Sequence, residues 1–108
     1  MHIPEKHVEH AFDILKAPDH AVARAAYEFA EKQLKVILAG AEQASDGKTV
    51  GERQADALTS DAYERALKDF KLIAENYYKA KDRRDAASAV IEAWRTQQSD
   101  LRAMGRVG

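Results

Sequence analysis

The stretch DAYERALKDFKLIAENYYKAKDRRDAASAVIEAWRTQQSDLRAM, from Asp61 to Met104, decides the fold of this chain. It contains neither glycine nor proline, and the same holds for the whole range from Glu52 to Met104. It is rich in Ala, Leu, Glu, Lys, Arg and Gln, which have the highest helix propensities. A single helix over this stretch would be about 65 Å long, at about 1.5 Å per residue. No small globular domain is that wide, so the helix must bury an apolar stripe against another elongated element.

The apolar residues of this predicted helix follow the spacing of a coiled coil. They alternate steps of four and three residues, which gives the average period of about 3.5 residues that keeps one seam facing a partner helix. Two polar residues interrupt the seam, and such residues lower stability but can fix register and partner number. The seam positions are Ala66, Phe70, Ile73, Tyr77, Ala80, Arg84, Ala87, Ile91, Trp94, Gln98 and Leu101.

A second long helix is predicted from about Asp19, a suitable N-cap residue, to about Ala44. Its apolar positions also step by four and three residues, and most of them are alanines, which let a neighbouring helix approach closely. The tetrapeptide from Ser45 to Lys48 is the clear turn of the chain. The seam positions of this helix are Ala23, Tyr27, Ala30, Leu34, Ile37, Ala41 and Ala44.

Two shorter helices complete the pattern. Residues 4–16 form one, because proline suits a first helical turn and the residue before Pro18 disfavours helical backbone. Residues 50–58 form the other, because Thr49 and Glu52 have the spacing of a capping box. Asp61 and Glu64 offer a second such box at the start of the long helix. We therefore predict a single helical domain over residues 1–108, with helices at about 4–16, 19–44, 50–58 and 61–104.

The predicted fold is all-α: an elongated antiparallel helical hairpin or coiled coil with a long C-terminal helix and a short N-terminal helix. The helix over residues 19–44 is shorter than its partner and leaves the last part of the long helix uncovered. Helix 4–16 could fold back on that part through Val8, Phe12 and Leu15, or a second copy could cover it. We expect the second copy, and hence a homo-oligomer, most simply a dimer. The residues expected to self-associate are Ile91, Trp94 and Leu101.

Composition limits the classes of function. The formal net charge of −1 argues against a strongly basic nucleic-acid module and against an acidic DNA mimic. The chain has no cysteine, so disulfides and cysteine-based zinc sites are excluded. Its first residues lack the pattern of a signal peptide, and its apolar runs are far shorter than a membrane span. These features predict a cytoplasmic protein.

Motifs for catalysis or cofactor binding are not apparent. His7 and His10 stand three residues apart near Glu5 and Glu9, but no further ligand cluster completes a metal site, and His2 and His20 do not supply one. The serines are typical of caps and turns, and the glycines lack the spacing of a phosphate-binding loop. We expect no enzyme activity, no catalytic residue, no metal and no cofactor.

One basic segment is a candidate for nucleic-acid contact. It comprises Lys79, Lys81, Arg83 and Arg84, next to two tyrosines. Cations beside aromatic rings can hold single-stranded nucleic acid through phosphate contacts and base stacking. Asp82 and Asp85 lie among these cations, however, so we favour the interpretation of an ordinary charged helix.

Several stretches resemble a group of small helical proteins of tailed bacteriophages and prophages. They are YEFAEKQLKVIL at 27–38, VGERQA at 50–55, SDAY at 60–63, IEAWRTQQS at 91–99 and RAM at 102–104. Proteins of this group are often encoded among early genes for recombination and replication, and no activity is established for them. The resemblance therefore implies a non-enzymatic phage accessory protein in the bacterial host cell, which binds a phage or host protein in recombination or replication. The alternatives are a weak single-stranded DNA-binding protein, an inhibitor of a host defence or nuclease complex, and a structural coiled-coil adaptor.

Overall fold

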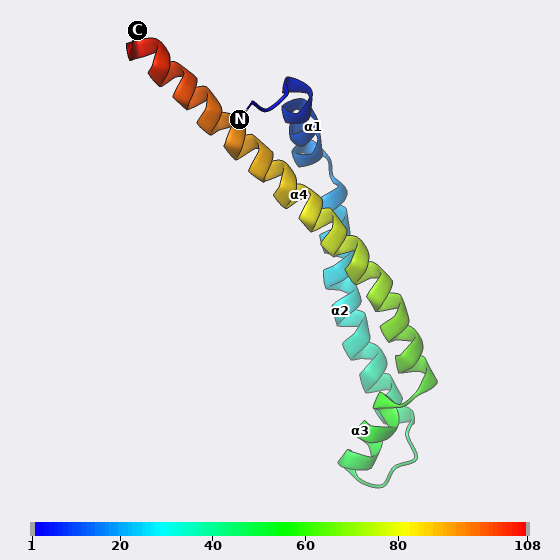
Figure 1. Ribbon diagram of the computed structural model, residues 1–108. Helices are drawn as coiled ribbons and strands as arrows, with labels where there is room; N and C mark the ends of the chain where they lie inside the picture. The colour runs from blue at the N-terminus through cyan, green and yellow to red at the C-terminus, as the bar shows by residue number, and fades with distance from the viewer. Residues whose placement is uncertain (1, 108) are drawn as a thin grey trace. The chain divides into compact units, whose positions relative to one another are not determined.

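The computed structural model describes residues 2–107, which form four α-helices and, within that range, no strand (Figure 1). These are α1 (Glu5–Lys16), α2 (Asp19–Ala44), α3 (Val50–Leu58) and α4 (Asp61–Val107). The predicted all-α class, the short first helix and the long last helix are confirmed. The predicted continuity of the last helix beyond Trp94 is also confirmed, because α4 runs without a break to Val107. None of these helices is long and apolar enough to cross a membrane.

Local hydrogen bonds fix the start of α3 as the sequence predicted. The Thr49 hydroxyl accepts a hydrogen bond from the Glu52 backbone N–H at 3.1 Å. The Glu52 carboxylate accepts in turn from the backbone N–H of Lys48 at 2.7 Å, one residue before the cap. The first bond satisfies an N–H group that a helix N-terminus would otherwise leave without a partner, and the second ties the preceding loop to the helix.

The start of α4 differs from the predicted capping box. Asp61 is the first helical residue, so the cap is Ser60, whose hydroxyl accepts from the Tyr63 backbone N–H at 3.3 Å. The same hydroxyl donates to the Ala57 carbonyl at 2.7 Å and links the end of α3 to the start of α4. The prediction that Asp61 is the cap and Glu64 its box partner was therefore wrong by one residue.

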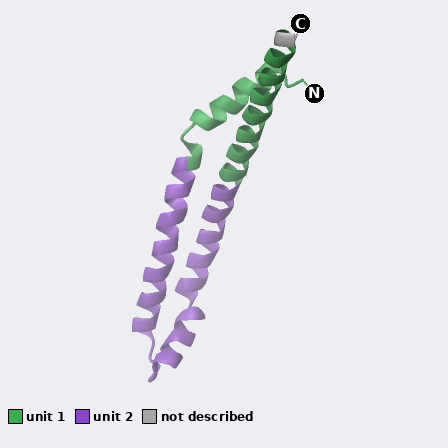
Figure 2. Cartoon of the chain, turned by 90° about the vertical axis from the view of Figure 1, so that its left-hand side faces the viewer, with its two compact units in different colours: residues 1–20, 79–108 green, residues 21–78 purple. Residues whose placement is uncertain are grey.

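The chain packs as two compact units (Figure 2). One of them, Ala21–Tyr78, holds most of α2, all of α3 and the first part of α4. Here α2 and α4 lie antiparallel, and α3 sits at the connection between them (Figures 1 and 2). This is the predicted helical hairpin. The expectation of a single domain stays a prediction.

The seam of this hairpin is built around Tyr27. Its ring centroid lies 4.8 Å from that of Tyr77, with the planes nearly stacked, and 5.4 Å from that of Phe70. Ala23 and Ala30 are buried on the same side of α2, while Ile73 is half-buried. The predicted packing of Phe70 and Tyr77 against the α2 seam is confirmed.

The other unit comprises residues 1–20 and 79–108, and in it α1 lies antiparallel to the last part of α4 (Figure 2). Its buried core is small: Val8, Ala11, Ala87 and Ile91, with Phe12, Leu15 and Trp94 among the partly buried residues around it. The Ile3 backbone N–H donates to Gln97 Oε1 at 2.9 Å and ties the chain start to α4. In this single chain α1 folds back over Ile91, whereas the expected contact with a second copy stays a prediction.

Candidate protein-binding surface

The basic segment of α4 lies on the surface but not as one patch. Lys79, Lys81, Arg83 and Arg84 are all exposed. Successive residues of a helix are rotated by about 100°, so Lys79 and Arg83 share one side while Lys81 and Arg84 point towards the other. Lys81 Nζ is also 3.8 Å from Asp85 Oδ2. The cations are therefore divided between two sides of the helix, and one of them has an acidic neighbour.

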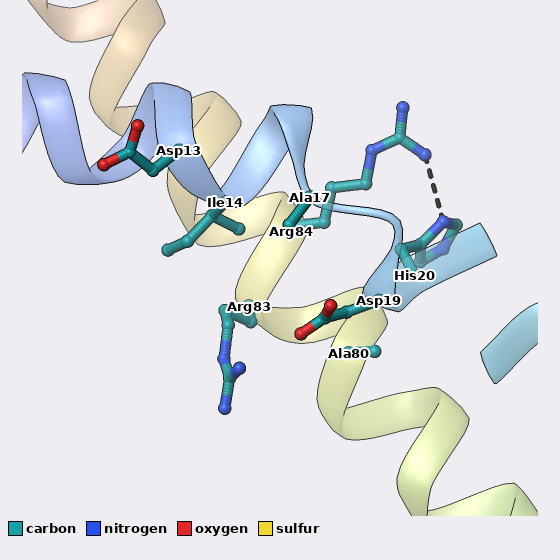
Figure 3. A pocket seen from close by; sticks show the side chains of 8 residues that line it. All are labelled: Asp13, Ile14, Ala17, Asp19, His20, Ala80, Arg83 and Arg84. Carbon is teal, nitrogen blue, oxygen red and sulfur yellow. Dashed lines mark hydrogen bonds between the residues drawn. The ribbon is translucent and has the colours of Figure 1, made fainter. Parts of the chain in front are cut away.

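Arg83 and Arg84 help to line a pocket of about 190 Å³ in the same unit. Arg84 Nη1 donates to His20 Nδ1 at 3.1 Å, whereas Arg83 extends the other way (Figure 3). Two carboxylates, Asp13 and Asp19, also line the pocket. Acids beside the cations oppose the binding of phosphate, so the pocket is a poor match for a nucleic-acid backbone.

The three residues predicted to self-associate have different surroundings. Ile91 is only 3% exposed, since α1 covers it. Trp94 is half-buried and meets Phe12 edge to face. Leu101 remains 54% exposed. Ile91 thus has no free surface for a second copy in this fold, and only Leu101 of the three stays largely open.

The histidines do not form a cluster typical of a metal site. His2, His7 and His10 are exposed, while His20 contacts Arg84 as described above. Over residues 2–107, no group of three His, Asp or Glu side chains is arranged to hold a metal ion.

The most exposed apolar side chains of α2 form a line, which we call the outer stripe: Val22, Phe29 and Val36. Their exposed fractions are 64%, 63% and 71%. Residues seven apart on a helix point within about 20° of the same direction, so the three lie along one side of α2. Each stands one residue before a buried or half-buried seam position, Ala23, Ala30 or Ile37. The outer stripe is therefore rotated by about 100° from the seam that faces α4.

Leu72 of α4 is a further exposed apolar side chain of the hairpin. The contacts of Tyr27 with Phe70 and Tyr77 set the register, which brings Leu72 to the level of Phe29. Leu72 also stands one residue before a seam position, and in an antiparallel helix pair such positions lie on the same side as those of the partner helix. Its exposed fraction is 65%.

Small residues border the outer stripe on α2. Ala25, Ala26, Ala39 and Gly40 are all exposed. A Cβ atom placed on Gly40 would meet nothing within 4 Å. A further helix can therefore approach the α2 backbone closely along this side, as ridges of one helix pack into grooves of another.

The outer stripe lies outside the predicted contacts, which placed only one apolar seam on α2. The signal was present, because Val22, Phe29 and Val36 stand at an unbroken seven-residue spacing. The seam through Ala23, Tyr27 and Ala30 was correctly predicted to face α4, but the exposed side chains beside it were not predicted to form a surface.

No protein-family model, curated protein or solved structure matches this chain.

Proposed function

We propose that the protein is a non-enzymatic protein-binding module that docks a helix of its partner along the outer stripe. The exposure of Val22, Phe29 and Val36 is the observation that carries this proposal. Three large apolar side chains exposed along one side of one helix exceed the scattered single residues that are common on protein surfaces. Side chains at heptad spacing are the anchors that helix-to-helix recognition uses.

The biological setting of the proposal comes from the resemblance to small proteins of tailed bacteriophages. It supports an accessory role in phage recombination or replication, in the cytoplasm of the bacterial host, with a phage or host protein as partner. An inhibitor of a host defence or nuclease complex and a structural coiled-coil adaptor would also act by binding protein, and both could use the same surface. The identity of the captured protein distinguishes these three roles.

Direct binding of single-stranded DNA is the less favoured function. The four cations at 79–84 are divided between two sides of α4, and acids accompany them. We expect no submicromolar binding to single-stranded DNA at physiological salt. Tight binding that is lost in the triple variant Lys79→Glu/Lys81→Glu/Arg83→Glu would reverse this preference.

Site-specific photo-crosslinking tests the protein-binding proposal. A photoreactive amino acid at Val36 should form adducts with a partner in infected or lysogenic cells. The matched control position is Lys35, which is exposed but rotated by about 100° from Val36, away from the outer stripe. Val22→Glu should weaken the adduct at position 36, since a carboxylate in an apolar contact loses its hydration. Equal adducts at positions 35 and 36, or none at 36, would contradict the proposed surface.

A further inference from the structure

We propose that the outer stripe pairs with the outer stripe of a second copy, with the two α2 helices antiparallel and Phe29 on the two-fold axis. This inference rests on the proposed protein-binding function and makes a second copy, in place of a phage or host protein, the occupant of the outer stripe. It also moves the predicted dimer contact from α4 to α2, because α1 already covers Ile91.

The symmetry of the stripe is the first argument. Val22 stands seven residues before Phe29, and Val36 stands seven residues after it. When an identical helix is laid antiparallel about Phe29, each Val22 meets the Val36 of the other copy, and the two Phe29 rings meet each other. A two-fold contact requires such a self-complementary surface.

The sizes of the intervening residues fit the same register. Ala25 and Ala26 precede Phe29 by four and three residues, and Lys32 and Gln33 follow it by three and four. In the antiparallel pair, each small residue therefore faces a long side chain of the other copy: Ala26 opposite Lys32, and Ala25 opposite Gln33. Alternation of small and large residues across facing positions lets two helices interdigitate.

The charge of the surface also suits a second copy. The positions of the 4-3 line on this side of α2 are Val22, Ala26, Phe29, Gln33, Val36 and Gly40, and none of them carries a charge. Pairing with an identical surface therefore brings no like charges into direct opposition along that line. Leu72, which the register places at the level of Phe29, is also exposed and uncharged.

Single-cysteine crosslinking tests the register directly, since the native chain has no cysteine. Phe29→Cys alone should crosslink to itself with a short bismaleimide reagent. Val22→Cys alone and Val36→Cys alone should not, because like positions would stand about 21 Å apart, at about 1.5 Å per residue. A mixture of a tagged Val22→Cys chain with an untagged Val36→Cys chain should crosslink, and this pair keeps the Phe29 ring.

Three results would overturn the arrangement. Crosslinking of Val22→Cys to itself would indicate a parallel pair. Crosslinking of Leu101→Cys, without any at positions 22, 29 and 36, would return the contact to α4. Absence of crosslinks at all four positions would remove self-pairing.

Sedimentation of the purified full chain gives an independent measurement. The wild type should show a concentration-dependent mass above the 12.0 kDa of one chain. Phe29→Glu should raise the dissociation constant at least tenfold while the helical circular dichroism is retained, and the matched control Lys35→Glu should leave it unchanged. A wild type that stays at the monomer mass up to hundreds of micromolar contradicts self-pairing alone. In that case, a Val36 adduct with a different protein in host cells would still support the protein-binding function, whereas absence of both would reject both proposals.

Discussion

The rings of Phe12 and Trp94 meet edge to face, with their centroids 6.3 Å apart and their planes at 84°. The two residues come from opposite ends of the chain, one from α1 and one from the last part of α4. This contact lies at the edge of the small core made by Val8, Ala11, Ala87 and Ile91. The environment of the Trp94 ring therefore shows whether α1 is folded back on α4.

Phe12→Ala should expose the indole of Trp94 to water and shift its fluorescence to longer wavelength. Trp94 is the only tryptophan in the chain, so the emission spectrum has a single source. The loss of the aromatic pair should lower stability by about 0.5–1.5 kcal/mol in addition to the lost apolar burial. An unchanged emission maximum would mean that α1 does not cover Trp94 in solution.

Ile91→Ala should destabilise the protein more than Ile73→Ala. Ile91 is buried between α1 and α4, so its truncation leaves a cavity and should cost about 2–5 kcal/mol. Ile73 is only half-buried in the hairpin, and its truncation should cost less. Denaturant unfolding followed by circular dichroism compares the two variants. An equal loss in both, or a larger one for Ile73→Ala, would contradict the burial seen here.

Gly47→Ala and Gly40→Ala should have opposite effects on stability. A Cβ atom on Gly47 would lie 2.9 Å from Glu52 Cβ and 3.0 Å from the Arg53 backbone nitrogen, so the loop before α3 would have to shift. We expect a loss of about 1–3 kcal/mol from this crowding. Gly40 lies inside α2 with open space around it, and alanine there should add about 0.5–1 kcal/mol through helix propensity. Thermal unfolding of the pair measures both, and a stabilising Gly47→Ala would show that the loop is not held closely.

Tyr27 should deprotonate only at unusually high pH. Hydrogen bonding to Tyr78, followed by Glu31 and by burial, raises the pKa of the Tyr27 hydroxyl above the ordinary range of tyrosine. The folded state therefore keeps this proton at a pH where the unfolded chain, with a tyrosine pKa of about 10, has lost it. The associated stability is fully present below about pH 10 and disappears as the pH rises through the folded value.

The ultraviolet absorbance of the phenolate measures this titration. Its component above the ordinary range should be missing in Tyr27→Phe, and Glu31→Gln should move that component to lower pH because it removes a negative charge near the hydroxyl. Retention of the same component in Tyr27→Phe would assign the raised pKa to another group.

The sequence by itself determined the helices and the period of their contacts. Pro18 ends α1, Thr49 caps α3, and the lack of glycine and proline from Asp61 to Met104 favours a continuous α4, which runs on through Gly105. These effects are local, because they depend on backbone geometry and hydrogen bonds within a few residues. The 4-3 spacing on α2 and α4 likewise predicted the seam at Tyr27 and Phe70. Only the tertiary structure decided that α1 covers α4 around Ile91 and leaves Leu101 exposed. It also decided that the outer stripe of α2 stays exposed. Those outcomes depend on contacts between segments far apart in the chain, such as the hydrogen bond between Ile3 and Gln97. Alternative segments compete to bury the same apolar area, and the folded chain shows which of them does so. The heptad period alone does not reveal that Val22, Phe29 and Val36 stay exposed, because these residues repeat every seven positions just as the seam residues do.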